Sequence, residues 1–340
     1  MADLAADSDA APRRSILREL WRSPVFTALL ALALVLVLGT VFSGAGAFHK
    51  WSTHRDMLRQ ASVFGILACG MTIVIISAGI DLSVGSLVAL TAVCFSIFCI
   101  HREWPAWAAI AVCLAIGTGC GIVSGGLTAR FGIQPFIVTL AMMVFARGLA
   151  KYISGGMKVS QAIRLPDDTY RFVGVPPIFQ AIDSRLLGGN ISVVTLIFLA
   201  CVLLCWVLLS RLRWGRYLYA IGGNEAAARL SGVPVGAMKL LAYGTCGFFA
   251  AVAGICQAAQ EAQGDPEAGV AYELSAIAIV VIGGTSLMGG RGGIGLTLLG
   301  TLIIGYIDKI LSINAVAEAS RLMLTGAIIV VAVLVQRRRT

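Results

Sequence analysis

Long apolar segments alternate with short polar intervals along almost the whole chain. A helix needs about 20 apolar residues to cross the hydrocarbon core of a bilayer. Ten segments approach or reach this length, at about 25–45, 58–79, 84–101, 106–128, 135–154, 191–210, 237–260, 272–288, 294–312 and 320–336. The pattern predicts an all-α integral membrane protein with about ten transmembrane helices. The eighth segment is short and leads into a glycine-rich stretch, so crossing and re-entry both remain open for it.

Composition agrees with this fold class and limits the domain organisation. The chain has 340 residues, of which 13% are charged, whereas a soluble domain carries about 25%. We expect a single transmembrane domain over 25–336, a cytoplasmic N-terminal segment (1–24) and a basic cytoplasmic tail (337–340). The longest polar interval, about 155–190, is expected to form an ordered loop or short helices. The nine cysteines lie in apolar segments without CxxC spacing, which favours packing over metal or redox chemistry.

The distribution of lysine and arginine predicts the orientation. If all ten segments cross, most basic residues outside the long 147–190 stretch fall on the side of both termini and of residues 211–235, which is therefore expected to be cytoplasmic. The acidic loop 261–267 then lies outside. The net charge of +9 reflects this anchoring and gives no reason to expect nucleic-acid binding. Arg13-Arg14 before the first segment resembles an export signal, but the apolar run is long enough to span, which favours a retained helix.

A polar island at 211–235 separates two long apolar segments and carries the signals of a short helix. Asn224 is a good N-cap, and Glu225 places a negative charge at the positive end of the helix dipole. Three alanines follow (Ala226, Ala227 and Ala228), Arg229 can pair with Glu225 at i,i+4, and Gly232 suits a left-handed C-terminal position. A helix over 225–231 is only about 10 Å long. It therefore has to lie at a membrane face.

Two glycine-rich breaks interrupt the apolar pattern, at 79–85 and 282–290, and can be aligned as a weak internal repeat. Paired breaks of this kind in two halves of a chain point to a transporter site. Asp81 and Ser83 in the first break are either wall residues of a solute path or caps of the following helix, since a carboxylate at membrane depth is costly. Thr285 and Ser286 in the second break either face a solute or belong to a tight turn.

Catalytic and nucleotide-binding signatures are missing from the sequence. It contains no GxxxxGK[ST] loop, no HExxH motif and no recognisable catalytic triad. We therefore expect a transport subunit and not an enzyme, without cofactor or metal. A transport pathway that presents a short rigid helix to the cytoplasm, but cannot hydrolyse ATP, indicates that the energy source is a separate subunit.

Four co-linear motifs resemble the permease subunits of bacterial ABC sugar importers of the ribose/xylose/galactose type. They are Gly79-Ile-Asp-Leu-Ser-Val-Gly-Ser86, Pro135-Phe-Ile-Val-Thr-Leu140 with Arg147-Gly-Leu149, Gly215-Arg-Tyr-Leu-Tyr-Ala-Ile-Gly-Gly-Asn-Glu-Ala-Ala-Ala-Arg-Leu-Ser-Gly232, and Ile282-Gly-Gly-Thr-Ser-Leu-Met-Gly-Gly-Arg291. The resemblance covers about residues 55–338. The long 155–190 interval and the hydrophilic first 12 residues depart from the family pattern without touching a motif.

The resemblance implies partners, a location and roles for individual residues. It implies a bacterial inner-membrane complex with a cytoplasmic ATP-binding-cassette ATPase, an extracytoplasmic sugar-binding protein and a second permease subunit, as a homo- or heterodimer. The ATPase-coupling residues are expected to be Gly215, Arg216, Asn224, Glu225, Ala226, Ala227, Ala228, Arg229 and Gly232. The candidates for the translocation path are Asp81, Ser83, Thr139, Thr285 and Ser286.

The solute itself remains open at this level, because specificity is expected to rest largely with the binding protein. The favoured solute is a pentose or hexose, and the same type of importer for a branched-chain amino acid, polyol or furanosyl signalling molecule is the alternative. A stand-alone secondary transporter would need coupling acids at depth, for which Asp81 is the single candidate. A membrane enzyme would need an acid/base or metal cluster that the sequence lacks.

Overall fold

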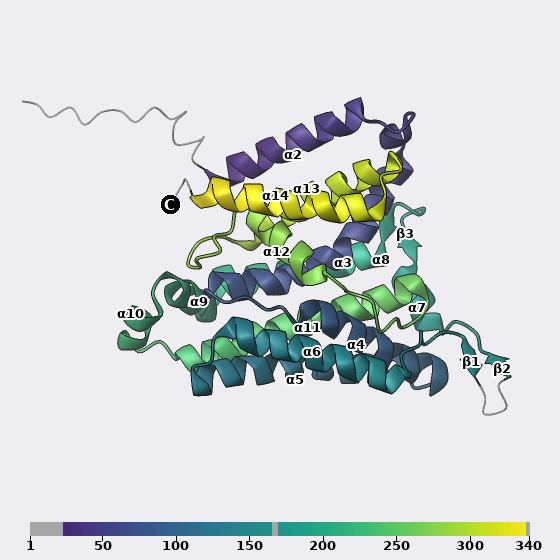
Figure 1. The fold of residues 1–340 in the computed structure, drawn as a ribbon, viewed down its shortest axis with the longest axis horizontal. Helices are drawn as coiled ribbons and strands as arrows, with labels where there is room; N and C mark the ends of the chain where they lie inside the picture. Colours follow the sequence, from purple (N-terminus) through teal and green to yellow (C-terminus); the bar gives the residue numbers. More distant parts are fainter. Residues whose placement is uncertain (1–22, 165–168, 338–340) are drawn as a thin grey trace, which may run out of the picture.

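The computed structural model describes residues 23–164 and 169–337. The predicted N-terminal segment (1–24) and basic tail (337–340) lie almost wholly outside these ranges. The described chain is a bundle of roughly parallel and antiparallel helices with two small hairpins at one end (Figure 1).

Ten hydrophobic helices follow the ten predicted segments in order. They are α2 (Pro24–Val41), α3 (Trp51–Ile76), α4 (Val84–Ser96), α5 (Ala106–Phe131), α6 (Pro135–Ser154), α8 (Val193–Trp206), α11 (Val235–Glu261), α12 (Tyr272–Gly283), α13 (Ile294–Ile313) and α14 (Glu318–Arg337). Helices α4 and α8 continue as π-helical turns, Ile97–His101 and Val207–Arg211, and a 3₁₀ turn, Ala47–His49, precedes α3. Eight helices in the described ranges are long and apolar enough to cross a membrane. The prediction of an all-α membrane fold is confirmed.

Helix α12 is the clear exception in length. Its 12 residues give about 18 Å of helix, which is shorter than a hydrocarbon core of about 30 Å. The predicted segment 272–288 therefore does not cross as one continuous helix, since the chain leaves helical geometry at Gly284 and turns through 285–293.

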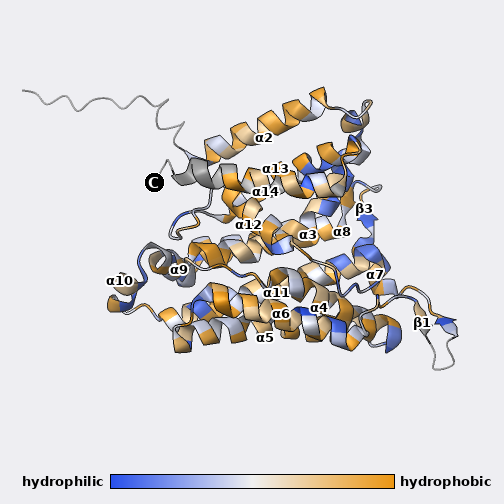
Figure 2. Ribbon diagram, viewed as in Figure 1, coloured by the Kyte–Doolittle hydropathy of each residue, from blue (hydrophilic) through white to orange (hydrophobic). Residues whose placement is uncertain are grey.

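The bundle has a central group of helices and an outer group. In α3 and α4, 83% of the most hydrophobic window is buried, against 17% in α2 and 22% in α5. The outer helices are apolar on their exposed faces as well, which is what contact with lipid requires. Figure 2 shows hydrophobic residues along the helices and hydrophilic ones gathered at the two ends of the bundle.

Glycines in α5 allow its backbone to approach the backbone of the central helix α11 closely. A Cβ atom at Gly121 would lie 2.1 Å from the carbonyl oxygen of Tyr243, and one at Gly117 would lie 2.5 Å from that of Gly247. Small residues at helix interfaces are the usual means of close packing in membranes. The glycine-rich composition of the fourth segment therefore serves this interface.

The two ends of the bundle differ in structure. At one end, which we term the coupling end, lie α9 (Arg213–Gly223), α10 (Glu225–Leu230), the start of α2 and the end of α14 (Figure 1). At the other, the hairpin end, lies the described part of the predicted 155–190 loop, residues 155–164 and 169–190. It forms the antiparallel pairs β1 (Ala162–Arg164) with β2 (Tyr170–Phe172) and β3 (Arg185–Leu186) with β4 (Ile191–Ser192), separated by α7 (Pro177–Asp183). The acidic loop joins this end through backbone hydrogen bonds between Val159 and Gly264.

The α5–α11 interface predicts that substitutions of Gly119 and Gly121 differ strongly in their effect on stability. Gly121→Val forces branched side-chain atoms into the backbone of α11 and should destabilise the fold by about 3 kcal/mol or more. Gly119→Val is the matched control, because a Cβ at Gly119 meets no atom within 4 Å. Thermal unfolding of the purified protein in detergent measures both, and equal losses would contradict the packing described here.

Candidate functional site

The short helix α10 has the caps that the sequence predicts. The Asn224 side chain accepts a hydrogen bond from the Ala227 amide at 3.0 Å, which satisfies one of the free N–H groups of the first turn. The helix ends at Leu230, one residue earlier than predicted, and Gly232 takes a left-handed φ of 78°. The pattern of caps thus located a real helix, and its role in coupling remains a prediction.

Glu225 joins α10 to the neighbouring long helix α11. Its carboxylate pairs with Arg229 at 3.0 Å, as predicted, and also with Lys239 of α11 at 2.9 Å. Partial burial alone would raise the pKa of Glu225, but Lys239 and then Arg229 outweigh it, so the pKa of this carboxyl is lowered. Glu225 is therefore held ionised between two cations, which fixes α10 against the membrane-embedded part of the protein.

Helix α9, which contains Gly215 and Arg216, was not predicted from the sequence. Its buried positions, Gly215, Leu218, Ile221 and Gly222, recur at helical spacing and were a readable signal. Gly215 packs against the end of the preceding helix, because a Cβ there would lie 2.3 Å from the Leu209 carbonyl oxygen. Arg216 is exposed. The polar island is thus two consecutive helices, and the capped helix α10 is the second.

The C-terminal end of α9 lies against the second break and against the end of α3, which leads into the first break. The amide of Gly290 in the second break donates to the carbonyl of Ile76, at the end of α3, at 3.0 Å. A Cβ at Gly222 would lie 1.8 Å from that same oxygen and 2.4 Å from the Gly290 nitrogen. We call this meeting of Ile76–Ala78, Gly222–Gly223 and Gly289–Gly290 the break junction. Tyr219 of α9 adds a hydrogen bond to the Gly292 carbonyl at 3.0 Å.

Three of the path candidates lie together at the first break. Asp81 is completely buried, and its Oδ1 accepts hydrogen bonds from the amide and the hydroxyl of Ser83 at 2.9 and 2.6 Å. The Thr139 hydroxyl of α6 donates to the Ile80 carbonyl at 3.4 Å. Asp81 therefore binds both polar groups of Ser83, the residue before α4 begins at Val84, whereas Ser83 as N-cap makes no side-chain hydrogen bond to the first turn of α4. The choice between a wall residue and a cap stays a prediction.

Thr285 and Ser286 take part in a turn of their own. The Ser286 amide donates to the Arg291 carbonyl at 3.0 Å, and the Ser286 hydroxyl accepts from Met288 at 3.3 Å. Thr285 is buried, and its hydroxyl accepts from the Gly293 amide at 3.4 Å. Both hydroxyls form hydrogen bonds within this turn, and a role of Thr285 and Ser286 toward a solute stays a prediction. The hydrogen bond from Gly290 of the second break to Ile76 at the end of α3 joins backbone atoms.

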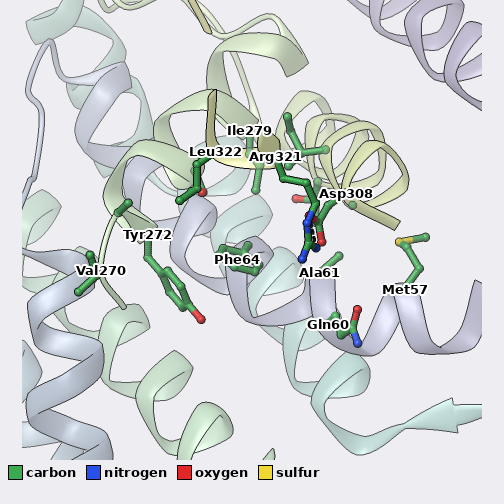
Figure 3. A pocket seen from close by; sticks show the side chains of 15 residues that line it. Met57, Gln60, Ala61, Phe64, Val270, Tyr272, Ile279, Asp308, Arg321 and Leu322 are labelled. Carbon is green, nitrogen blue, oxygen red and sulfur yellow. Dashed lines mark hydrogen bonds and ion pairs between the residues drawn. The ribbon is translucent and has the colours of Figure 1, made fainter. Parts of the chain in front are cut away.

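A cavity of about 390 Å³ lies between α3, α12, α13 and α14. It was not predicted from the sequence. Its polar lining includes Gln60, Tyr272, Ser275, Asp308 and Arg321, and Figure 3 shows Arg321 reaching from α14 toward Asp308. None of the five path candidates lines it. Asp308 and Arg321 lie inside predicted spans, and charged residues at such positions were the available signal.

The described ranges contain no group of three or more histidine, cysteine or acidic residues arranged to hold a metal ion. The arrangement as a whole is a helix bundle with interrupted helices, a rigid helical connection at one end and a cavity in the other half. These are the parts of a membrane permease.

Comparison with known proteins places the chain in a family. Residues 54–333 match the family described as "Branched-chain amino acid transport system / permease component". The chain belongs to this permease family and is a multi-pass membrane protein.

Individual relatives are sugar permeases by name. The chain is 40% identical to the ribose import permease protein of Escherichia coli (strain K12) over 311 residues, 91% of this chain and 92% of the relative. It is 38% identical to the ribose import permease protein of Bacillus subtilis (strain 168), covering 84% of each chain. It is 34% identical to the fructose import permease protein of Rhizobium meliloti, covering 93% of this chain and 86% of the relative. No solved structure gives a significant match.

Two substitutions of Asp81 separate the roles of its oxygen and its charge. Asp81→Asn keeps an acceptor for the buried Ser83 amide, so we expect a folded and active protein. Asp81→Ala leaves that amide without its partner, at a cost of about 1–3 kcal/mol, so we expect lower thermal stability and reduced uptake. Unfolding in detergent and uptake in cells measure the two effects. Equal loss of uptake in both variants, with stability retained, would assign the function to the charge instead.

Proposed function

We propose that this protein is the permease subunit of an ATP-driven importer and carries a monosaccharide, a pentose or hexose, that an extracytoplasmic binding protein delivers. The observation that carries the proposal is the 40% identity over nine-tenths of the chain to a ribose import permease. The family description names amino-acid transport, but the relatives at 40%, 38% and 34% identity are named for ribose and fructose. The sugar is therefore favoured over a branched-chain amino acid.

The coupling end is where we place the ATPase. Helix α10 lies at the tip of this end (Figure 1), and its Leu230 side chain is 91% exposed, as expected for a residue that another protein covers. The coupling residues that the resemblance implies lie in and beside two helices of this end: Gly215 and Arg216 in α9, Glu225 to Arg229 in α10, and Asn224 and Gly232 before and after α10.

Movement of α10 can be transmitted to the membrane-embedded breaks through a series of contacts. Asn224 is the single residue between α9 and α10, and the ion pair of Glu225 with Lys239 joins α10 to α11. Gly222, at this same C-terminal end of α9, contacts the break junction. Movement of α10 by the ATPase would shift α9 and, through the junction, the ends of the helices that enclose the solute path. Asp81, Ser83, Thr139, Thr285 and Ser286 act in this scheme as groups that shape the breaks.

The remaining partners follow from the two ends of the bundle. With the coupling end in the cytoplasm of a bacterium, both termini are cytoplasmic and the hairpin end faces outward. The hairpins, α7 and loop 261–267 are then the surface that receives the binding protein. A second permease subunit completes the path in the bilayer of the inner membrane.

Breaking α10 tests the docking role directly. Ala227→Pro removes the amide that donates to the Asn224 cap, at a cost of about 1 kcal/mol, and the proline ring disfavours helical geometry at the preceding Ala226, so the first turn of α10 is disrupted. The membrane-embedded fold should remain, while sugar uptake and stimulation of the ATPase by the binding protein are lost. Uptake of labelled ribose and fructose by cells, with permease levels in the membrane as control, measures this. Normal uptake would exclude docking at α10.

Two adjacent glycines in α9 test this series of contacts. Gly222→Ala places a methyl group 1.8 Å from the Ile76 oxygen, whereas a Cβ at Gly223 meets nothing within 4 Å. We expect Gly222→Ala to reduce uptake about tenfold or more while the ATPase still binds, which corresponds to about 1.4 kcal/mol of lost coupling, and Gly223→Ala to behave as wild type. Equal uptake in both variants would show that the junction does not transmit the movement.

A further inference from the structure

The cavity between α3, α12, α13 and α14 has the position and size of a solute site. Its volume of about 390 Å³ falls within the range of about 300–1,000 Å³ found for small-molecule pockets. It lies nearer the hairpin end, because Met57 and Gln60 are close to the start of α3, and Asp308 is close to the end of α13. A solute that enters from the hairpin end would reach it before the breaks.

The lining combines aromatic rings with hydrogen-bonding groups. Phe64 of α3 and Tyr272 of α12 form a pair with ring centroids 4.5 Å apart and planes inclined at 49°. Gln60 contributes an amide and Ser275 a hydroxyl. In Figure 3 the rings of Tyr272 and Phe64 lie to the left of the Asp308–Arg321 pair, and Gln60 lies below that pair. Mostly apolar walls with a few placed polar groups are typical of small-molecule sites.

The charged pair in the cavity matches a neutral, hydroxyl-rich solute. Arg321 donates to Asp308 at 3.2 Å, so the carboxylate and guanidinium together add no net charge. The carboxylate offers acceptors and the guanidinium donors, which is what the hydroxyl groups of a sugar need. The pair joins α13 to α14, and a solute that exchanged hydrogen bonds with it would bind to both helices.

The walls of the cavity lead directly to the break junction. Helix α3 passes from Gln60 and Phe64 to Ile76, and α12 passes from Tyr272 and Ser275 to the second break after Gly283. From Phe64 to Ile76 is 12 residues, or about 18 Å of helix. A shift at the junction therefore moves two walls of the cavity as rigid bodies.

From this geometry we propose that the cavity holds the monosaccharide during its passage, with Phe64 and Tyr272 against the sugar ring and Gln60, Ser275, Asp308 and Arg321 bound to its hydroxyl groups. The inference rests on the proposed function and extends it to a binding site within one permease subunit. Binding there is weak, since release toward the cytoplasm must follow.

Protection of a cysteine in the cavity tests the proposal in the assembled importer. Ser275→Cys is close to isosteric, and eight of the nine native cysteines are buried, so a small thiol reagent should modify the new thiol preferentially. Ribose or fructose at about twice its dissociation constant should slow the modification about threefold. Ser312→Cys, at an exposed position near the end of α13 and outside the cavity lining, is the matched control, and its rate should not respond to sugar.

A matched pair of carboxylates separates binding from general stability. Asp308→Asn in the Ser275→Cys background should abolish protection and lower uptake about tenfold, because a hydrogen bond to a charged group is lost. Asp56→Asn removes the carboxylate of another ion pair on α3, 2.7 Å from Arg185 and outside the cavity lining, and should leave protection intact.

The outcomes distinguish this inference from the proposed function. If the wild-type importer takes up ribose or fructose but neither sugar protects the thiol, the cavity is not a sugar site although the function stands. If leucine protects and sugars do not, the solute class is wrong. If the wild-type importer takes up no monosaccharide, the proposed function fails and the inference fails with it. Protection by sugar that Asp308→Asn removes and Asp56→Asn retains supports the site.

Discussion

The structure depends on how backbone groups are satisfied where helices stop inside the bundle. No water is available in the hydrocarbon core, so interrupted helices are tolerated only where other protein groups replace the missing hydrogen bonds. Here the second break and the end of α3, which leads into the first break, do this for each other, since the Gly290 amide donates to the Ile76 carbonyl. The contact is so close that position 222, on a third element, has no room for a Cβ. The requirement for hydrogen bonding thus brings α3, the second break and α9 to a single point.

That single point relates the two ends of the protein. On one side of it, α9 leads to the capped helix α10, whose carboxylate Glu225 is held between Arg229 and Lys239. On the other side, α3 and α12 lead to the cavity with Phe64, Tyr272 and the Asp308–Arg321 pair. Short helices joined through close backbone contacts deform little, because a packed interface has few alternative arrangements. We propose that a displacement at the coupling end reaches the cavity walls in this way.

Much of the fold could be read from the sequence because membranes impose strong rules. Segment lengths gave the ten helices in order, and Asn224, Glu225 and Gly232 located α10 to within one residue. Helix α9 was missed because its polar surface residues, Arg213 and Arg216, resemble a loop unless the buried glycines are counted as part of a face. At the hairpin end, the backbone hydrogen bonds between Val159 and Gly264 join distant parts of the chain, which local patterns do not record.

The site was harder to predict than the fold. Local chemistry singled out Asp81, Ser83, Thr285 and Ser286 as either wall residues or local structural groups, but it could not show that the second break meets the end of α3 through glycines. The cavity draws its lining from four helices spread over more than 260 residues of chain. Charges inside apolar segments marked Asp308 and Arg321 individually. Only the packing of α13 against α14 brings them together.

The energy source is the most direct test of this account. The permease is reconstituted in proteoliposomes with its ATPase and sugar-binding protein, and uptake of labelled ribose and fructose is measured with ATP, with a non-hydrolysable analogue, and with an imposed proton or sodium gradient. We predict accumulation that requires both ATP hydrolysis and the binding protein and that does not respond to the ion gradient. Accumulation by the permease alone, driven by the gradient without ATP, would contradict the account.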